Sequence, residues 1–147
     1  MAKSGKLSPK LKAAQKKLKA EAKIVLAKAA NEAVNHFKAN FKVGGFVDRS
    51  AEKWKPRKGN KDPGRGVLIG KGGGRLKRSI RRSSLTSKRT IIGISGTPKK
   101  YASVHNFGLR AGRGAGFLMP KRKFMGESRV LNKKIGRLIN RHIKKIL

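Results

Sequence analysis

Two stretches of the chain alternate apolar and basic residues with the period of an α-helix. After Ser8 and Pro9, apolar side chains recur every three or four residues as far as Phe37, with lysines between them. Ser8 suits an N-cap and Pro9 the first helical position, so the pattern predicts an amphipathic helix over residues 8–41. A helix on the order of 45 Å long exceeds what one small core covers. We therefore expect part of its apolar stripe to meet another subunit.

Residues 127–147 carry the second helical pattern. Leu131, Ile135 and Ile139 fall on one side of the predicted helix together with His142, and the basic residues point away from it. The expected role of His142 is packing rather than ligand binding. This segment predicts a C-terminal amphipathic helix.

Residues 44–126, between the two helical patterns, predict a loop-rich β core. Residues 44–74 are rich in Gly, Lys and Pro and read as a long loop, anchored by Trp54 and the apolar run 67–69. Residues 80–85 and 89–95 alternate in polarity around a short polar turn, which predicts a β-hairpin.

The following segments complete the expected order of elements. Residues 101–108 predict a short helix closed by Gly108, and a glycine- and arginine-rich loop follows at 110–116. The predicted fold class is α+β: a long N-terminal helix, a small antiparallel β-sheet with a hairpin, and a C-terminal amphipathic helix. At 147 residues, one domain over 1–147 is expected.

The net charge of the chain limits the classes of molecule that it is expected to bind. Lys and Arg number 40 against 6 acidic residues, giving a formal net charge of +34 that is spread along the whole chain. A folded body this basic repels itself unless a polyanion or an acidic surface neutralises it, and nucleic acid is the leading partner on charge alone. There is no cysteine, no signal-peptide pattern and no apolar run long enough for a membrane span.

The inventory of chemical groups does not favour an enzyme. Glu21 and Glu32 are about three helical turns apart, and Asp48 and Glu52 are more plausible as surface ion pairs than as a metal site. Each histidine is alone in its segment. His105 shares a helical face with Tyr101, but a buried or capping role is favoured because no nucleophile motif accompanies it. We expect no catalytic residues, no metal and no cofactor.

The glycine-rich run at 70–75 could touch a phosphate through its backbone amides. It departs from the phosphate-binding loop G-x-x-x-x-G-K-S/T, because Gly72 follows Lys71 and Arg65 occupies the position of the first glycine. A flexible turn is the favoured reading, and nucleotide hydrolysis is unsupported.

Two basic clusters are the candidate nucleic-acid contacts. With few aromatic residues available for base stacking, the expected mode is sequence-independent contact with the phosphate backbone. The alternative is that these residues bind acidic faces of neighbouring proteins. The predicted contact residues are Arg75, Lys77, Arg78, Arg81, Arg82, Lys121, Arg122 and Lys123.

The order of motifs from Trp54 to the C-terminus resembles the phage virion-morphogenesis, or tail-completion, family. The segments that carry the resemblance are 67–69, 74–80, 101–108 and 119–126, over about residues 46–147. The long lysine-rich helix and the extreme charge are not attributed to the family. The resemblance implies a structural virion protein without catalytic residues, assembled in the host cytoplasm, that forms a ring at the neck or tail end.

That ring, expected to be a hexamer, would join tails to DNA-filled heads beside neighbouring neck, portal or tail proteins. Two other classes remain open. Composition alone favours a cellular nucleic-acid-binding protein of ribosomal or nucleoid type. The amphipathic helices alone suggest a membrane-active protein, although no membrane partner is expected.

Overall fold

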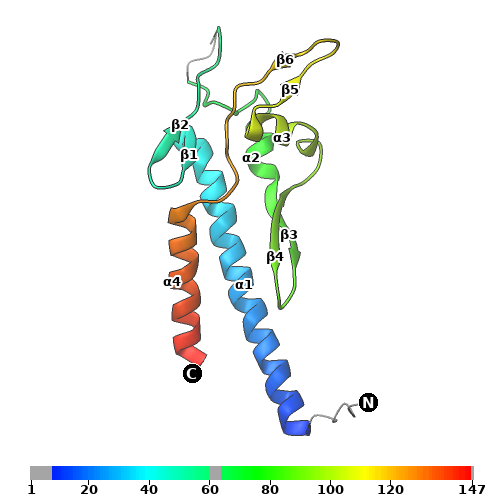
Figure 1. The fold of residues 1–147 in the computed structure, drawn as a ribbon, viewed down its shortest axis with the longest axis vertical. Coiled ribbons are helices and arrows are strands. Elements are labelled where there is room, and N and C mark those ends of the chain that lie inside the picture. Colours follow the sequence, from blue (N-terminus) through cyan, green and yellow to red (C-terminus); the bar gives the residue numbers. More distant parts are fainter. Residues whose placement is uncertain (1–7, 60–63, 147) are drawn as a thin grey trace, which may run out of the picture.

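The computed structural model describes residues 8–59 and 64–146 (Figure 1). Asp62 and Leu147, the latter being the last residue of the predicted C-terminal helix, lie outside these ranges. The mixture of helices and antiparallel strands confirms the predicted α+β class. The elements are α1 (Pro9–Val43), β1 (Gly45–Val47), β2 (Ala51–Lys53), α2 (Arg75–Ser79), β3 (Ile80–Leu85), β4 (Thr90–Ile94), α3 (Lys99–Phe107), β5 (Arg110–Ala111), β6 (Phe117–Leu118) and α4 (Arg129–Ile146).

The long first helix forms where the sequence predicts it. The Leu11 amide donates a hydrogen bond of 3.3 Å to Ser8 Oγ, so Ser8 is the N-cap, and Pro9 occupies the first turn. Gly44 ends the helix at φ +66°, a left-handed conformation that glycine adopts without a steric penalty.

Only the C-terminal half of α1 is packed into the protein. Its buried side chains begin at Ala29, whereas Leu11 and Leu18 are 53% and 65% exposed. In Figure 1, α4 runs along one side of α1 and the β3–β4 hairpin along the other, while the N-terminal part of α1 (blue) extends beyond both. The core therefore leaves much of the predicted apolar stripe uncovered.

The strands form three separate two-stranded antiparallel sheets within the described residues, rather than one small sheet. The β3–β4 pair is the predicted hairpin, with Ile80 opposite Ile94 and a bulge between Arg82 and Ser84. The β1–β2 and β5–β6 pairs lie in segments predicted to be loops. In β1–β2, a Cβ at Gly45 would clash with the backbone of Glu52, so the close pairing requires glycine.

Two short helices frame the hairpin. α2 forms where the sequence suggests only a basic cluster, because Leu76 and Ser79 on one side of this turn are buried. α3 confirms the predicted short helix, although it begins at Lys99, and Gly108 closes it at φ +71°.

The core gathers side chains from segments that are far apart in the sequence, from α1 to α4. Phe41 of α1 lies 5.4 Å from the rings of both Trp54 and Phe124, measured between ring centroids. The partly buried Val67, Leu68 and Ile69 pack against this cluster, so the apolar run anchors the long loop as predicted. The buried apolar cluster consists of Ala33, Phe37, Phe41, Trp54, Leu76, Ile80, Ala102, Phe124 and Leu131.

Two buried asparagines fix the backbone around Phe124. Asn40 Nδ2 of α1 donates to the Phe124 carbonyl at 3.1 Å. Asn106 Oδ1 of α3 accepts from the amides of Phe124 and Met125, at 2.9 and 3.0 Å. Trp54 Nε1 donates to the preceding carbonyl, that of Lys123, at 2.7 Å. These side chains satisfy backbone groups in a segment that has no sheet or helix of its own.

We expect Asn106→Ala to lower the free energy of unfolding by about 2–4 kcal/mol, because it leaves the two amides of Phe124 and Met125 without their acceptor. Denaturant unfolding measures the change. Asn140→Ala, at an exposed position of α4, is the matched control and should change stability by less than about 0.5 kcal/mol. Equal effects of the two substitutions would contradict this role for Asn106.

Candidate nucleic-acid interface

The carboxylates of α1 serve to hold α4. Glu21 Oε2 lies 3.0 Å from His142 Nε2, and Glu32 Oε1 lies 3.5 Å from Lys134 Nζ. His142, expected to be a packing residue, thus has a polar partner on the neighbouring helix. These pairs cross between α1 and α4, so they stabilise the helix pair.

Asp48 and Glu52 have different surroundings in the fold. Asp48 Oδ1 accepts a hydrogen bond of 2.6 Å from the Arg129 amide at the start of α4, while Glu52 lies in β2 with its side chain exposed. Within residues 8–59 and 64–146, no cluster of three His, Cys, Asp or Glu residues is placed to bind a metal ion.

The predicted nucleic-acid contacts fall into two groups. One group lies on α2 and β3, and the other lies on the extended segment between β6 and α4. The side chains of Arg75, Arg78, Arg81, Arg82 and Lys121 are exposed, those of Lys77 and Lys123 are half-buried, and that of Arg122 is buried.

Arg122 is a structural residue in this fold. It is 7% exposed, its Nε donates to the Lys55 carbonyl at 3.1 Å, and its Nη2 donates to the Pro56 carbonyl at 3.3 Å. Burial lowers the pKa of its guanidinium, and the nearby Arg57 charge lowers that pKa further. A buried side chain with these partners has little surface to offer to DNA.

Arg78 and Lys123 also make internal contacts. Arg78 donates through its guanidinium to the carbonyls of Gly72 and Gly73, and it thereby holds the glycine-rich turn ahead of α2. The Lys123 ammonium lies 4.0 Å from the centroid of the Phe46 ring, in a cation–π contact. Both residues still carry their charge near the surface.

Arg81 and Arg82 point to opposite faces of the hairpin. Residues paired across a sheet share a face, and Arg81 is paired with Gly93 whereas Arg82 is paired with Ile92, which packs on the core. Arg75, Arg78 and Arg81 line a common hollow of about 360 Å³ at the base of the hairpin. The structure therefore brings these three arginines together and separates Arg82 from them.

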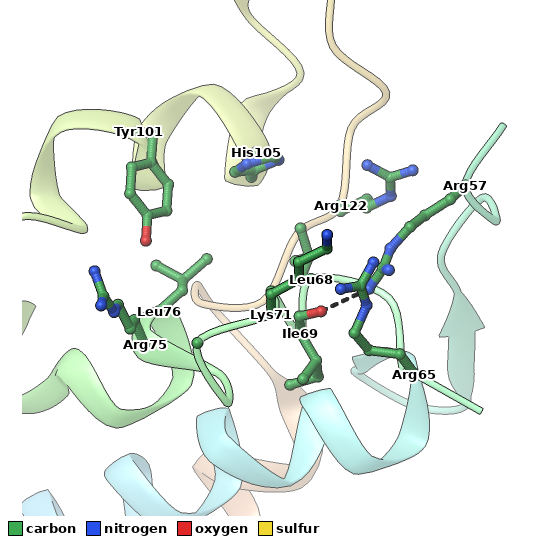
Figure 2. Close-up of a pocket in the computed structure, with 12 residues that line it drawn as sticks. Arg57, Arg65, Leu68, Ile69, Lys71, Arg75, Leu76, Tyr101, His105 and Arg122 are labelled. Atoms are coloured by element: carbon green, nitrogen blue, oxygen red, sulfur yellow. Dashed lines mark hydrogen bonds between the residues drawn. The ribbon is translucent and has the colours of Figure 1, made fainter. Parts of the chain in front are cut away.

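A larger cavity of about 630 Å³ lies between α3 and the loop ahead of α2 (Figure 2). It contains three basic residues that were not among the predicted contacts, namely Arg57, Arg65 and Lys71. They lie in the segment that sequence patterns identify only as a loop, so no periodic signal could have placed them together. The cavity is lined by Arg57, Arg65, Leu68, Ile69, Gly70, Lys71, Gly72, Arg75, Leu76, Tyr101, His105 and Arg122.

His105 faces this cavity from α3. Its ring packs edge-on against the Tyr101 ring, with centroids 5.9 Å apart, and its Nδ1 is buried. Burial lowers the pKa of His105, and the positive charge of Arg122 lowers it further. The half-buried position agrees with the favoured structural reading of this histidine.

None of the helices within the described ranges combines the length and the apolar character needed to cross a membrane. The fold and its surface thus define a strongly basic α+β protein, with α1 only partly covered by its own core. The chain belongs to the phage virion morphogenesis family, whose model matches residues 4–144. Comparisons with curated proteins and with solved structures find no match.

The family match confirms the suspected resemblance and widens it. The sequence motifs carried the resemblance over about residues 46–147, whereas the match also covers α1. The long basic helix is therefore part of the family match rather than an addition to it. The protein has a role in phage virion morphogenesis and is associated with the virion.

We expect the protein to lose stability as the pH falls below 6.5, the ordinary pKa of histidine. Burial lowers the pKa of both His36 and His105 in the folded protein. On acidification the unfolded chain therefore binds protons at a higher pH than the folded protein does, and this proton binding favours unfolding. The contribution of these histidines is fully present above pH 6.5. It is lost between that value and their lower folded-state pKa values.

Thermal unfolding from about pH 8 to about pH 5 tests this dependence. The double variant His36→Gln/His105→Gln should lose most of the pH-dependent decline in stability, because it removes both histidines whose pKa burial lowers. The His142–Glu21 pair is present in both proteins, so it does not cause a difference between them. Identical pH profiles for the variant and the wild type would show that other groups cause the decline.

Proposed function

We propose that the protein is a structural component of the neck or tail end of a tailed phage. In this proposal it forms a homo-oligomeric ring, expected to be a hexamer, that joins the tail to the head and contacts DNA. The observation that carries the proposal is the family match over residues 4–144, taken together with a net charge of +34 on a small α+β protein. No catalytic turnover is proposed, because the α1 carboxylates and Asp48 have structural partners.

The uncovered part of α1 supports the ring. Leu11, Leu18 and Ile24 are exposed on it, and Ile143 and Ile146 are exposed on the last turns of α4. Large apolar side chains grouped on exposed helices favour contact with another protein surface. A second copy is the proposed partner because identical basic chains need an apolar contact to overcome their mutual repulsion.

We expect Leu11→Gln/Leu18→Gln to weaken self-association by at least tenfold, because it removes apolar area from the proposed contact. Sedimentation velocity over a range of protein concentrations measures the change. Lys12→Gln/Lys19→Gln, at exposed positions of the same helix turns, is the matched control and should leave association intact or strengthen it. A wild-type protein that stays monomeric at high concentration would refute the ring.

DNA contact through the phosphate backbone is the second part of the proposal. DNA that passes through a ring must be held without reading its bases, since every sequence moves through the same opening. Lys and Arg on exposed surfaces provide such contact. The residues available for it are Arg75, Lys77, Arg78, Arg81, Arg82, Lys121 and Lys123, while buried Arg122 is left out.

We expect binding to duplex DNA to be independent of sequence and strongly dependent on salt. If about six phosphates are engaged, log affinity against log salt has a slope near −5, from ~0.9 counterions released per phosphate. Arg81→Gln/Arg82→Gln should make the slope less steep by up to about 2. Arg137→Gln/Arg141→Gln on α4 removes the same charge and is the control. A wild-type slope near zero would refute DNA contact.

A cellular nucleic-acid-binding protein, of ribosomal or nucleoid type, is the alternative that composition alone favours. Mass spectrometry of purified virions separates the two. The proposed function requires the protein in intact particles at a constant copy number. Absence from the particle together with co-sedimentation with ribosomes would establish the alternative.

A further inference from the structure

The cavity beside α3 concentrates positive charge. Five cationic side chains line it, and no Asp or Glu of the described residues does. Figure 2 shows these cations arranged around the cavity, with Arg57, Arg65 and Arg122 on one side, Lys71 near the centre and Arg75 beneath Tyr101 on the other side. Like charges brought together in a partly desolvated space favour an anionic partner. The five cations are Arg57, Arg65, Lys71, Arg75 and Arg122.

Apolar side chains form a second part of the lining. Leu68, Ile69 and Leu76 form the floor of the cavity, and the ring of Tyr101 extends toward Leu76 from α3 (Figure 2). Leu68 adopts φ +62°, which is unfavourable for a residue with a branched side chain, and within the described ranges no other non-glycine residue has a positive φ. Arg57 holds this turn by donating to the carbonyls of Gly66 and Ile69. Strained backbone of this kind is concentrated at binding sites.

One polar atom in the cavity wall lacks a hydrogen bond. His105 Nδ1 is buried and has no hydrogen-bond partner among the described residues. Most buried polar atoms in folded proteins are paired, so His105 is a lining residue whose hydrogen bonding the described residues leave incomplete.

We propose that this cavity binds an acidic segment of a different protein, with an apolar side chain of the segment on the floor and its carboxylates against the cationic rim. The inference rests on the proposed function for the source of the segment, which is a neighbouring virion protein. An apolar anchor in a pocket surrounded by polar contacts is the usual arrangement of strong sites in protein interfaces.

Duplex DNA fits the cavity less well. Its backbone presents phosphates and sugars, which leave an apolar floor unfilled. Among the described residues of the lining, only Tyr101 and His105 carry an aromatic ring that could stack a displaced base. A second copy of this chain also fits poorly. Its Glu21 and Glu32 pair with α4 and its Asp48 accepts from the Arg129 amide, so few carboxylates remain to offer.

Fluorescence anisotropy with synthetic peptides tests the proposal on the full-length protein. One labelled probe is a short peptide of Asp and Glu around a central leucine, and the second has serine in place of the leucine. We expect the leucine peptide to bind at least tenfold more tightly, because only its side chain fills the floor.

Two single variants assign the binding to the cavity. Leu68→Gly removes one apolar side chain from the floor, and glycine suits the positive φ of this turn, so the leucine peptide should bind only as well as the serine peptide. Lys71→Gln should weaken both peptides several-fold. Lys144→Gln, an exposed position on α4 with the same loss of charge, is the control and should change neither by more than about twofold.

Three results would overturn the proposal. The first is equal binding of the two peptides, with Lys71→Gln and Lys144→Gln acting alike, which indicates non-specific charge attraction. The second is no binding of either peptide to the wild type. The third is a loss of duplex DNA affinity in Leu68→Gly, which would assign the cavity to DNA. Peptide binding can fail while the DNA salt slope and the virion location stand, so the two proposals are tested separately.

Discussion

The fold depends on one buried stretch of backbone, residues 122–125. It has no regular structure, yet Phe124 is 1% exposed, so its polar groups must be satisfied inside the protein. The His105 carbonyl accepts the Arg122 amide at 2.8 Å, and Asn40, Trp54 and Asn106 bind the residues that follow. This stretch therefore joins α1, the segment after β2 and α3 into one body. It also leads into α4 and holds the Arg122 side chain at the cavity wall, so the surrounding surfaces depend on its position.

Arginine stabilises the loops of this protein in place of secondary structure. Arg57 binds the carbonyls of 66 and 69, Arg78 those of 72 and 73, and Arg122 those of 55 and 56. A planar guanidinium with several donors can bridge two carbonyls at once, which suits glycine-rich turns whose backbone has few other partners. Part of the +34 charge is thus committed to the fold. The net charge overstates the number of side chains that are free to bind another molecule.

The sequence predicted α1, α4 and the central hairpin because their apolar spacing is regular, and it predicted α3 from the glycine that closes it. It did not predict α2, which is only five residues long. The short β1–β2 and β5–β6 pairs carry too few residues for any period.

The candidate site was harder to predict for a different reason. A run such as Lys121-Arg122-Lys123 looks uniform in the sequence, but an extended backbone turns alternate side chains to opposite sides. Tertiary contacts buried Arg122 and left Lys121 exposed, and they brought Arg57 and Lys71 to the same cavity from a segment without a pattern.

Apolar contact and electrostatic attraction are favoured by two different surfaces of the molecule. The exposed half of α1 lies at one end of the molecule, whereas α2 and α3 lie toward the other (Figure 1). Residues of α2 and α3 line the cavity. Copies of so basic a chain repel one another, so contact between them depends on apolar area, and such area is available on α1. Attraction to other molecules instead depends on charge, which the cavity and the base of the hairpin concentrate. Because the two surfaces are far apart, the proposed ring can form through α1 without covering the cavity. In the proposed ring every subunit would offer one such cavity, so a partner that carries several acidic segments would bind with a higher overall avidity than a single segment.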